Sequence, residues 1–284
     1  MNTSNNTLGK DHKDQWLSLI PEQYRIKRVS AEEFFSKHYA TKEPCIIESV
    51  NWDCTKWTPE TLAEKLGQYE HSFSYEEGKS LQMPIKEYIS RVFMENDANS
   101  RQIPNLPTPP SSTEKVPYAR HIGPLTDQMY SDVQIEQLFP QDKLKGIRMR
   151  KFLFLGAAST KTNNHYDWSH NFVYCVQGIK HVTLLPPKSE AHMTNITEEL
   201  RAQLGRGDCF FVPEPEAFEL DLCHPKNGNE EGKVAMHQHP VLHKCPGLIY
   251  SPLFPGDVVF FPAYWYHYFH NVTSTVSVTI QTYC

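Results

Sequence analysis

The sequence predicts a mainly β domain, and three observations lead to that class. Residues 152–156, 172–178 and 180–187 are apolar runs of strand length, and a glycine-bearing turn joins the last two as in a hairpin. Residues 275–281 alternate between apolar and polar side chains, which is typical of a strand with two unlike faces. Twenty-one prolines and 13 glycines in 284 residues suit a chain with many strands and turns.

The N-terminal half has a different character. Residues 1–14 are polar and are expected to be disordered, and residues 15–140 mix predicted helices with a strand. Residues 96–117 contain five prolines and predict a loop that borders the mouth of a site. Capping signals and apolar patterns predict, in order, a helix from Ser30 to about Tyr39, a strand at 44–48, a helix from Thr58 to Gly67 and a helix from Pro84 to about Phe93.

Residues 188–250 form a long segment between predicted strands. They contain a predicted helix at 194–204, a predicted strand at 209–212 and an exposed tip at 227–232. A group of cysteines and histidines here has spacings that a structural zinc site could use, but it lacks a C-x2-C pair, so solvated loop side chains are the preferred interpretation. The group consists of Cys223, His224, His237, His239, His243 and Cys245.

The sequence also bears on the compartment. The N-terminus lacks the charged-then-apolar pattern of a signal peptide, and no apolar run reaches the roughly 18 residues of a membrane span. The chain is therefore expected inside the cell, in the cytoplasm, the nucleus or both, with no membrane partner. Of its seven cysteines, Cys175 and Cys209 fall in strand-like runs and are predicted to be free thiols. The sequons at Asn195 and Asn271 are accordingly interpreted as chance matches.

A candidate metal site joins residues 165–167 to the C-terminal part of the chain. His165 and Asp167 stand two positions apart, so both side chains point to the same face of a strand. His267, which follows an apolar strand and an aromatic cluster, could complete a set of two histidines and one carboxylate. Such a set leaves metal positions open, as non-haem Fe(II) oxygenases require. Taken alone, the H-x-D triplet would more often be a strand-end histidine and a loop aspartate. The strand-like runs and the aromatic cluster around these residues favour the metal site.

In these motifs the chain resembles the JmjC-domain (cupin-8 type) Fe(II)- and 2-oxoglutarate-dependent oxygenases. The similarity is collinear over about residues 30–284, and the spacing matches as well as the residue types. The matching positions are Thr162, His165, Asp167 and Asn171, then Gly178, Lys180 and Leu185-Pro186-Pro187, then Pro255-Gly256-Asp257, Pro262, Trp265 and His267, and the closing strand at 277–281.

The resemblance implies a double-stranded β-helix, which is a jelly roll, with iron held at one mouth of the barrel. Residues 141–284 would form this catalytic core. The segment at 188–250 would be an insertion between the strands that carry metal ligands. Residues 15–140 would form an α/β layer that buttresses the barrel.

For the site, the resemblance implies Fe(II) on the two histidines and the aspartate, with 2-oxoglutarate chelating that iron. Lys180 matches the cation that receives the far carboxylate of 2-oxoglutarate, and Thr162 matches a hydroxyl that hydrogen-bonds the same carboxylate. Asn171 matches an amide near the cosubstrate. Gln281 stands where the family often has asparagine and is expected to contact the cosubstrate.

Aromatic residues flank the predicted metal ligands. Trp168, Tyr264, Trp265 and Tyr266 are expected to form a hydrophobic shell that limits water access to the iron and borders the substrate pocket. Ordinary core packing is an equal alternative for these four. The polar face of residues 275–281 is expected to line the ligand cavity, because this strand closes the barrel.

The implied reaction uses O2 to oxidise 2-oxoglutarate to succinate and CO2 and hydroxylates a substrate. A protein or peptide side chain is the favoured substrate, because the chain shows no reader domain, zinc finger or basic tail of the kind that many chromatin demethylases carry. The net charge of −5 and the pI near 6.3 give no basic footprint for nucleic acid.

Three alternatives stay open at this point. The first is hydroxylation of a tRNA base, which a local basic groove would permit, and the second is lysine demethylation in the same barrel. The third and least favoured is a non-catalytic binding module. A monomer is favoured over a dimer, because some relatives dimerise through helices after the last barrel strand, whereas this sequence stops at Cys284.

Overall fold

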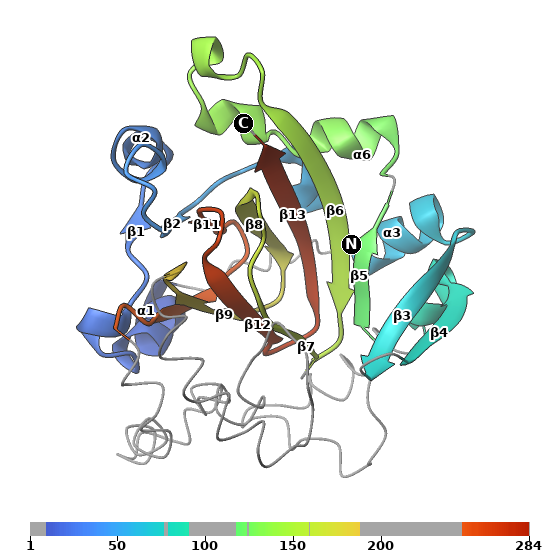
Figure 1. The fold of residues 1–284 in the computed structure, drawn as a ribbon. Coiled ribbons are helices and arrows are strands. Elements are labelled where there is room, and N and C mark those ends of the chain that lie inside the picture. The colour runs from blue at the N-terminus through green and yellow to red at the C-terminus, as the bar shows by residue number, and fades with distance from the viewer. Residues whose placement is uncertain are drawn as a thin grey trace, which may run out of the picture.

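The computed structural model describes residues 10–76, 79–90, 118–123, 125–158, 160–187 and 246–283. Two sheets pack face to face in this part of the chain, which confirms the predicted mainly β jelly roll (Figure 1). The smaller sheet contains, in spatial order, β10 (Ile249–Leu253), β9 (Lys180–Leu185), β12 (Tyr266–Asn271) and β7 (Lys161–His165). The larger sheet contains β1 (Arg28–Val29), β2 (Cys45–Ile47), β11 (Val258–Phe261), β8 (His170–Gln177), β13 (Thr275–Tyr283), β6 (Arg148–Gly156), β5 (Tyr118–Ile122), β3 (Glu70–Glu76) and β4 (Lys79–Pro84).

Strand pairing is antiparallel throughout both sheets except between β1 and β2, which run parallel. The hairpin predicted from residues 172–178 and 180–187 was wrong: these residues form β8 and β9, which follow each other in the chain but lie in different sheets and do not pair. Gly178 turns the chain between them with φ of +82°, a backbone conformation that L side chains rarely adopt. A Cβ at Gly178 would also meet the carbonyl oxygen of Ser274 at 2.1 Å.

An apolar cluster fills part of the space between the two sheets. Val173 and Cys175 of β8 point into it and meet Val182 and Leu184 of β9. The alternate residues of β8, Phe172, Tyr174 and Val176, point to the opposite face of the large sheet, where they join a second apolar cluster. Both faces of β8 are therefore buried, which explains why its sequence is continuously apolar rather than alternating.

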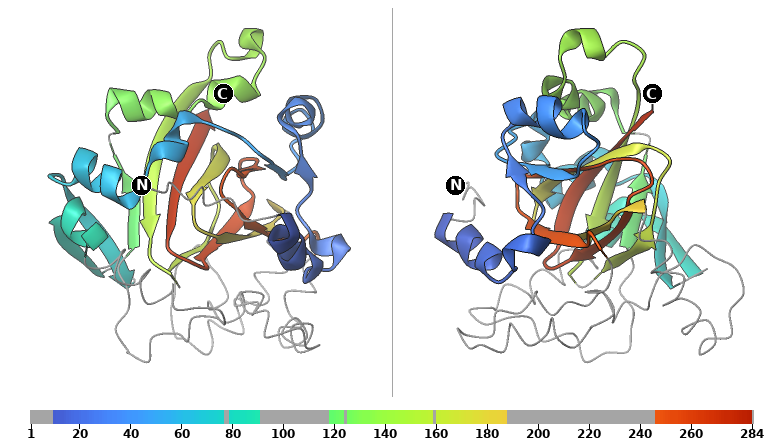
Figure 2. Two further views of the ribbon diagram at one scale, coloured as in Figure 1. Left: turned by 180° about the vertical axis from the view of Figure 1, so that it is seen from behind. Right: turned by 60° about the vertical axis from the view of Figure 1, so that its left-hand side comes forward.

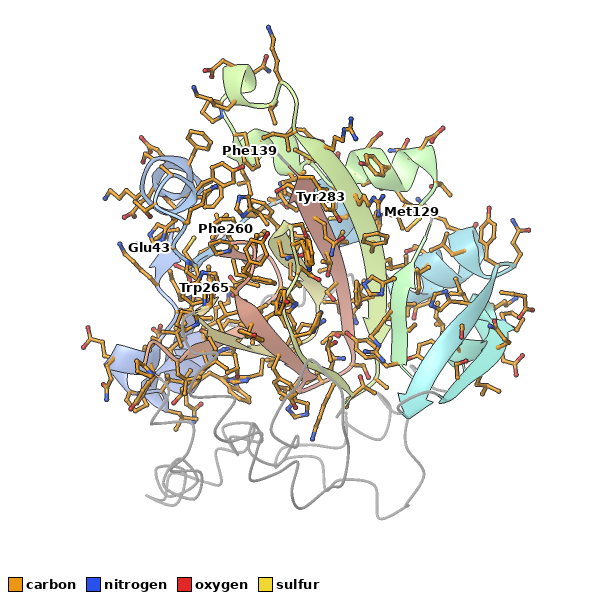
Figure 3. All side chains as sticks on the ribbon, in the orientation of Figure 1. Glu43, Met129, Phe139, Phe260, Trp265 and Tyr283 are labelled. Atoms are coloured by element: carbon orange, nitrogen blue, oxygen red, sulfur yellow. The ribbon has the colours of Figure 1, made fainter. Side chains whose placement is uncertain are left out.

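The second cluster joins the outer face of the large sheet to the N-terminal elements. The Phe34 ring lies with its centroid 5.2 Å from that of Phe260, 5.7 Å from that of Phe172 and 6.2 Å from that of Phe139. Figure 3 labels Phe139 and Phe260 in this cluster. Such edge-on aromatic contacts add to the large apolar area that these rings bury. The N-terminal residues thus support the barrel from outside.

N-terminal strands also extend the large sheet at both ends. β2 pairs with β11 at one end, and β5 pairs with β6 towards the other. The hairpin of β3 and β4, which the sequence did not predict, forms the far edge, opposite β1 (Figures 1 and 2). The helices around the sheets are α1 (Lys10–Ser18), η1 (Glu22–Tyr24), α2 (Ala31–Glu33), η2 (Phe34–Tyr39), η3 (Asp53–Lys56), α3 (Pro59–Leu66), α4 (Ile85–Tyr88), α6 (Asp127–Asp132), η5 (Ile135–Leu138) and η6 (Gln141–Lys143).

Most predicted N-terminal elements are present. Helix α3 begins after a Thr58 capping box, and α2 continues into the π-helical turn η2 to Tyr39. Residues 91–117, which include the end of the helix predicted from Pro84 and the proline-rich loop, lie outside the described residues, as do residues 188–245. Among the described residues, no helix combines the length and the apolar character needed to cross a membrane.

Two expectations about boundaries were wrong. Residues 10–14, expected to be disordered, belong to α1, because tertiary contacts hold this polar segment. The Lys13 ammonium lies 5.2 Å from the centroid of the Phe254 ring and 4.0 Å from a carboxylate oxygen of Asp257. The insertion predicted for residues 188–250 ends earlier, since β10 begins at Ile249 and pairs with β9 inside the jelly roll.

Candidate metal centre

His165, Asp167 and His267 come together at neighbouring strand ends. His165 closes β7 and pairs across the sheet with His267 of β12. One ligand atom from each residue lies within 4.8 Å of the other two, and Nε2 of His267 is 3.7 Å from Oδ2 of Asp167. Two imidazoles and one carboxylate in this arrangement fit a divalent transition metal.

His267 is prepared as a neutral ligand. Burial lowers the pKa of His267 well below its usual value, and the neighbouring His165 lowers it further. Its Nδ1 lies 3.1 Å from the carbonyl oxygen of Trp265, which can accept a hydrogen bond only if Nδ1 carries the proton. Nε2 is then left with its lone pair towards Asp167, which is the form that binds a metal.

Three residues around Asp167 hold it in place. The backbone N–H of Tyr264 donates to the Asp167 carbonyl at 2.8 Å, which ties the segment after β7 to the segment before β12. Nε2 of Gln281 donates to Oδ2 of Asp167 at 3.3 Å, and the Tyr283 hydroxyl donates to Oε1 of Gln281 at 2.9 Å. Gln281, which the sequence assigned to the cosubstrate, therefore contacts a metal-ligand carboxylate.

A pocket of about 250 Å³ opens beside these ligands, inside the barrel. It contains the three candidate metal ligands and three of the four residues assigned from sequence to the cosubstrate, namely Thr162, Asn171 and Lys180. Its remaining walls come from both sheets and consist of Tyr118, Arg120, His121, Phe154, Val173, Phe261, Phe269 and Thr279.

Lys180 is a buried cation in this pocket. Its side chain extends from β9 into the barrel, and the residue is 2% exposed. Its Nζ lies 2.9 Å from the Ser277 hydroxyl and 3.3 Å from the Tyr118 hydroxyl, and within the described part of the chain no carboxylate reaches ion-pair distance of it. A buried charge without a counter-ion is costly, so this ammonium fits an anionic ligand that enters the pocket.

Tyr118 is a site residue that the sequence analysis missed. Burial raises the pKa of its hydroxyl, but the Lys180 ammonium and hydrogen bonds with Thr162 and Asn271 outweigh burial and lower the pKa overall. The hydroxyl thus lies at the centre of a polar network around the lysine. Its only local signal is an aromatic residue directly after the proline-rich loop, which does not indicate that β5 will join the barrel beside β6.

Asn171 places in the pocket a buried acceptor that has no hydrogen-bond partner among the described residues. The residue is 1% exposed, and its Nδ2 donates to the Ser169 carbonyl at 3.0 Å. Its Oδ1 is buried without a hydrogen bond among the described residues. An orphaned acceptor and an unpaired ammonium in one pocket suit a polar ligand, because both groups were desolvated when the barrel closed.

None of the four aromatic residues expected to shield the metal ligands, namely Trp168, Tyr264, Trp265 and Tyr266, lines the pocket. Trp168 is 77% exposed and Tyr264 is 50% exposed, and their ring centroids lie 6.4 Å apart on the surface. Trp265 packs against the cluster between the sheets (Figure 3). The apolar walls beside the candidate metal ligands come instead from Phe261 and Phe269, which the sequence analysis did not single out.

The cysteines of the described residues are free thiols and do not line the pocket. Cys45, Cys54 and Cys175 are free and buried, and burial raises the pKa of the Cys175 thiol to about 12. Cys209 and the Cys/His group predicted as loop side chains lie outside the described residues. Asn271 is 1% exposed and hydrogen-bonds Thr160 and Thr275, so its sequon is not available to a glycosylating enzyme.

Residues 31–283 match the model of the cupin-like domain family. The chain belongs to that family. The predicted relationship to JmjC-domain proteins is confirmed by similarity to curated members.

Three relatives show the range of this similarity. The JmjC domain-containing protein A of Dictyostelium discoideum is 25% identical, with 91% of this chain and 94% of the relative covered. The lysine-specific demethylase JMJ21 of Arabidopsis thaliana is 22% identical over 90% of this chain, which spans only 24% of that protein. The tRNA wybutosine-synthesizing protein 5 of Mus musculus is 24% identical, with 88% of this chain and 73% of the relative covered.

Proposed function

We propose that this chain is an Fe(II)- and 2-oxoglutarate-dependent oxygenase that hydroxylates a protein side chain. The observation that carries the proposal is the buried ammonium of Lys180, which among the described residues meets two hydroxyls but no carboxylate and shares a pocket with two histidines and an aspartate. A dicarboxylate with one end on the metal and the other on the ammonium satisfies both features at once.

In this proposal His165, Asp167 and His267 hold the iron, and Lys180 receives the far carboxylate of 2-oxoglutarate. The iron supplies the activation of O2 that is coupled to oxidation of 2-oxoglutarate to succinate and CO2. Tyr118 and the Ser277 hydroxyl lie on the same ammonium and orient it. The protein contributes geometry and charge, and the cofactors contribute the oxidation.

The other residues of the pocket limit water and fix the ligands. The Phe261 ring lies with its centroid 4.5 Å from that of His267, so it covers one side of this imidazole. Gln281 orients the Asp167 carboxylate, and the Trp265 carbonyl fixes the tautomer of His267. Fixing each ligand before the reaction reduces the reorganisation needed during it.

A protein side chain is the proposed substrate class, and the alternatives make different products. The relatives include a protein named as a lysine demethylase and one named for tRNA wybutosine synthesis. The net charge of −5 supports a protein substrate over a polyanionic RNA. A demethylase would release formaldehyde, whereas a hydroxylase adds one oxygen atom to a product that keeps all its carbon atoms.

The deciding experiment incubates the protein with Fe(II), ascorbate, 2-oxoglutarate and a tryptic digest of cellular protein. We expect peptides that gain the mass of one oxygen atom, with succinate formed in parallel, and neither change with the Asp167→Ala variant. Turnover of 2-oxoglutarate only with a tRNA fraction would replace the protein substrate by RNA. Formaldehyde release with methyl-lysine peptides would make the chain a demethylase. If 2-oxoglutarate does not bind in a metal-dependent way, the chain would be a non-catalytic binding module.

We also propose that the protein is a monomer. The outer face of the large sheet, a large apolar surface, is already covered by the chain's own N-terminal elements. Light scattering at micromolar concentration is expected to give the mass of one chain. A mass near that of two chains would overturn the monomer.

A further inference from the structure

Arg120 lines the same pocket as the candidate metal ligands but has no role in the proposed chemistry. It belongs to β5, two residues after Tyr118, and its guanidinium lies 5.6 Å from the centroid of the Tyr118 ring. Among the described residues no ion pair between it and a carboxylate is present. This cation is therefore available to a ligand in the pocket.

The backbone of β5 is shaped to bring Arg120 and His121 to the pocket together. In a regular strand consecutive side chains point to opposite faces. Here the register against β6 shifts between Ala119 and Ile122, and His121 has φ of +57°, which is unusual for a residue with a side chain. The Arg120 carbonyl lies 2.9 Å from Nε2 of His71, and the His121 ring packs at 4.9 Å from the Phe154 ring. Strain of this kind persists where the surroundings enforce it.

When the metal and 2-oxoglutarate are bound, the positive charge of Arg120 is not balanced by another charge of the pocket. A divalent metal and Lys180 carry three positive charges, and Asp167 with the two carboxylates of 2-oxoglutarate carries three negative charges. Desolvation lowers the pKa of His121 and the Arg120 charge lowers it further, whereas Asp167 raises it. Arg120, which stays protonated, is then the unbalanced charge of the pocket.

We infer that Arg120 selects an acidic peptide, pairing with an Asp or Glu side chain close to the residue that is oxidised. The inference rests on the proposed function, because the metal and 2-oxoglutarate neutralise the rest of the pocket. One guanidinium fits one carboxylate through two parallel hydrogen bonds. An RNA strand would need a row of cations to follow its phosphates, whereas the pocket offers only this cation besides Lys180 among the described residues.

The experiment selects binders rather than products. A displayed library of random dodecapeptides is panned without O2 against the protein loaded with Mn(II) and 2-oxoglutarate. The same panning uses Arg120→Gln, Arg120→Glu and the control Arg148→Gln, which removes an exposed arginine of β6 outside the pocket. We expect Asp or Glu to be enriched at a fixed position with the wild type and the control, lost with Arg120→Gln, and replaced by Lys or Arg with Arg120→Glu.

A double-mutant cycle then tests the pairing directly. The best wild-type binder is resynthesised with its enriched Asp changed to Asn or its Glu changed to Gln. Either this change or Arg120→Gln alone is expected to weaken binding about tenfold, which is the loss of a charged hydrogen bond, and the two together are expected to weaken it no further. Additive losses would show that the two groups do not touch and would overturn the inference.

Separate measurements distinguish this inference from the proposed function. Affinity for 2-oxoglutarate with Mn(II) should be equal in Arg120→Gln and wild type. A large loss in Arg120→Gln would move Arg120 into the cosubstrate site and overturn the inference while the oxygenase proposal stands. Acidic peptides bound through Arg120 by a protein that never oxidises them would uphold the inference and defeat the oxygenase. If the protein enriches sequences from a random RNA pool only when Arg120 is present, and enriches no acidic peptides, the ligand of Arg120 is RNA and not a peptide.

Discussion

The two faces of β13 lie in two different regions of the molecule. On the outer face, Val276, Val278 and Ile280 are buried in the apolar cluster with the N-terminal elements. On the inner face, the Ser277 hydroxyl meets Lys180 and Gln281 meets the candidate metal ligand Asp167. The outer face therefore packs in the core, and the inner face contacts residues of the candidate ligand pocket.

The difference teaches which property each face controls. Apolar side chains of the outer face stabilise the fold by burial, and they gain nothing from a ligand. The inner face encloses Lys180 and the Oδ1 of Asn171, whose charge and lone pair the described protein atoms do not fully satisfy. A ligand that satisfies them stabilises the folded state. Substitutions on the two faces should accordingly separate stability from ligand affinity.

The largest effect is expected from Asp167→Ala, which removes the only carboxylate of the candidate metal site. Binding of Mn(II) and Fe(II) and all 2-oxoglutarate turnover should disappear. Thermal stability without metal should change little, because Asp167 lies at the barrel mouth, outside both apolar clusters. Metal titration and thermal unfolding measure the two properties. Full turnover in this variant would exclude Asp167 from the metal site.

The next largest effect is expected from Lys180→Ala on the inner face. Losing one partner of a buried charge pair costs about 3–5 kcal/mol, so the affinity for 2-oxoglutarate should fall by two or more orders of magnitude. Metal binding should persist, because the lysine is not a ligand. Calorimetry with Mn(II) present measures both affinities. If mutant and wild type bind 2-oxoglutarate equally, the ammonium has another purpose.

The sequence predicts this division of β13 well, because it depends on local alternation. An apolar residue at every second position places Val276, Val278 and Ile280 on one face whatever the rest of the fold does. His165 and Asp167 are also close in sequence, but the prediction that both lie on one strand was wrong, because β7 ends at His165 and Asp167 follows it. The confirmed jelly roll and family follow from such motifs taken together with their spacing.

What the sequence analysis missed depends on contacts between distant segments. Tyr118 reaches Lys180 only because β5 adds to the sheet beside β6, and no local pattern encodes that pairing. The partner of Gln281 depends on the register that sets it opposite Asn171 on β8. Helix α1 forms although its sequence is polar, because Lys13 contacts Phe254. In each case tertiary context overrides a weak local signal.

Ile280→Ala tests the outer face. Removing a buried isoleucine side chain costs about 2–5 kcal/mol, depending on how far the surroundings collapse into the cavity. We expect urea unfolding to show this loss while the folded variant binds Mn(II) and 2-oxoglutarate with wild-type affinity. A folded variant whose affinity for 2-oxoglutarate falls as far as that of Lys180→Ala would mean that the two faces are coupled.

The smallest effect is expected from Gln281→Ala. This variant tests whether Gln281 supports the metal site or the cosubstrate site. Gln281 touches Asp167 and the Tyr283 hydroxyl, so its loss leaves the carboxylate free to turn. Removing such an outer hydrogen bond typically lowers metal affinity about tenfold or more, and Tyr283→Phe should have a weaker effect in the same direction because it acts through Gln281. Mn(II) titration measures both variants, and 2-oxoglutarate affinity at saturating Mn(II) is the control. If Gln281→Ala instead weakens 2-oxoglutarate and leaves metal affinity intact, the residue serves the cosubstrate as its sequence position suggested, and its hydrogen bond to Asp167 gives way when the ligand enters.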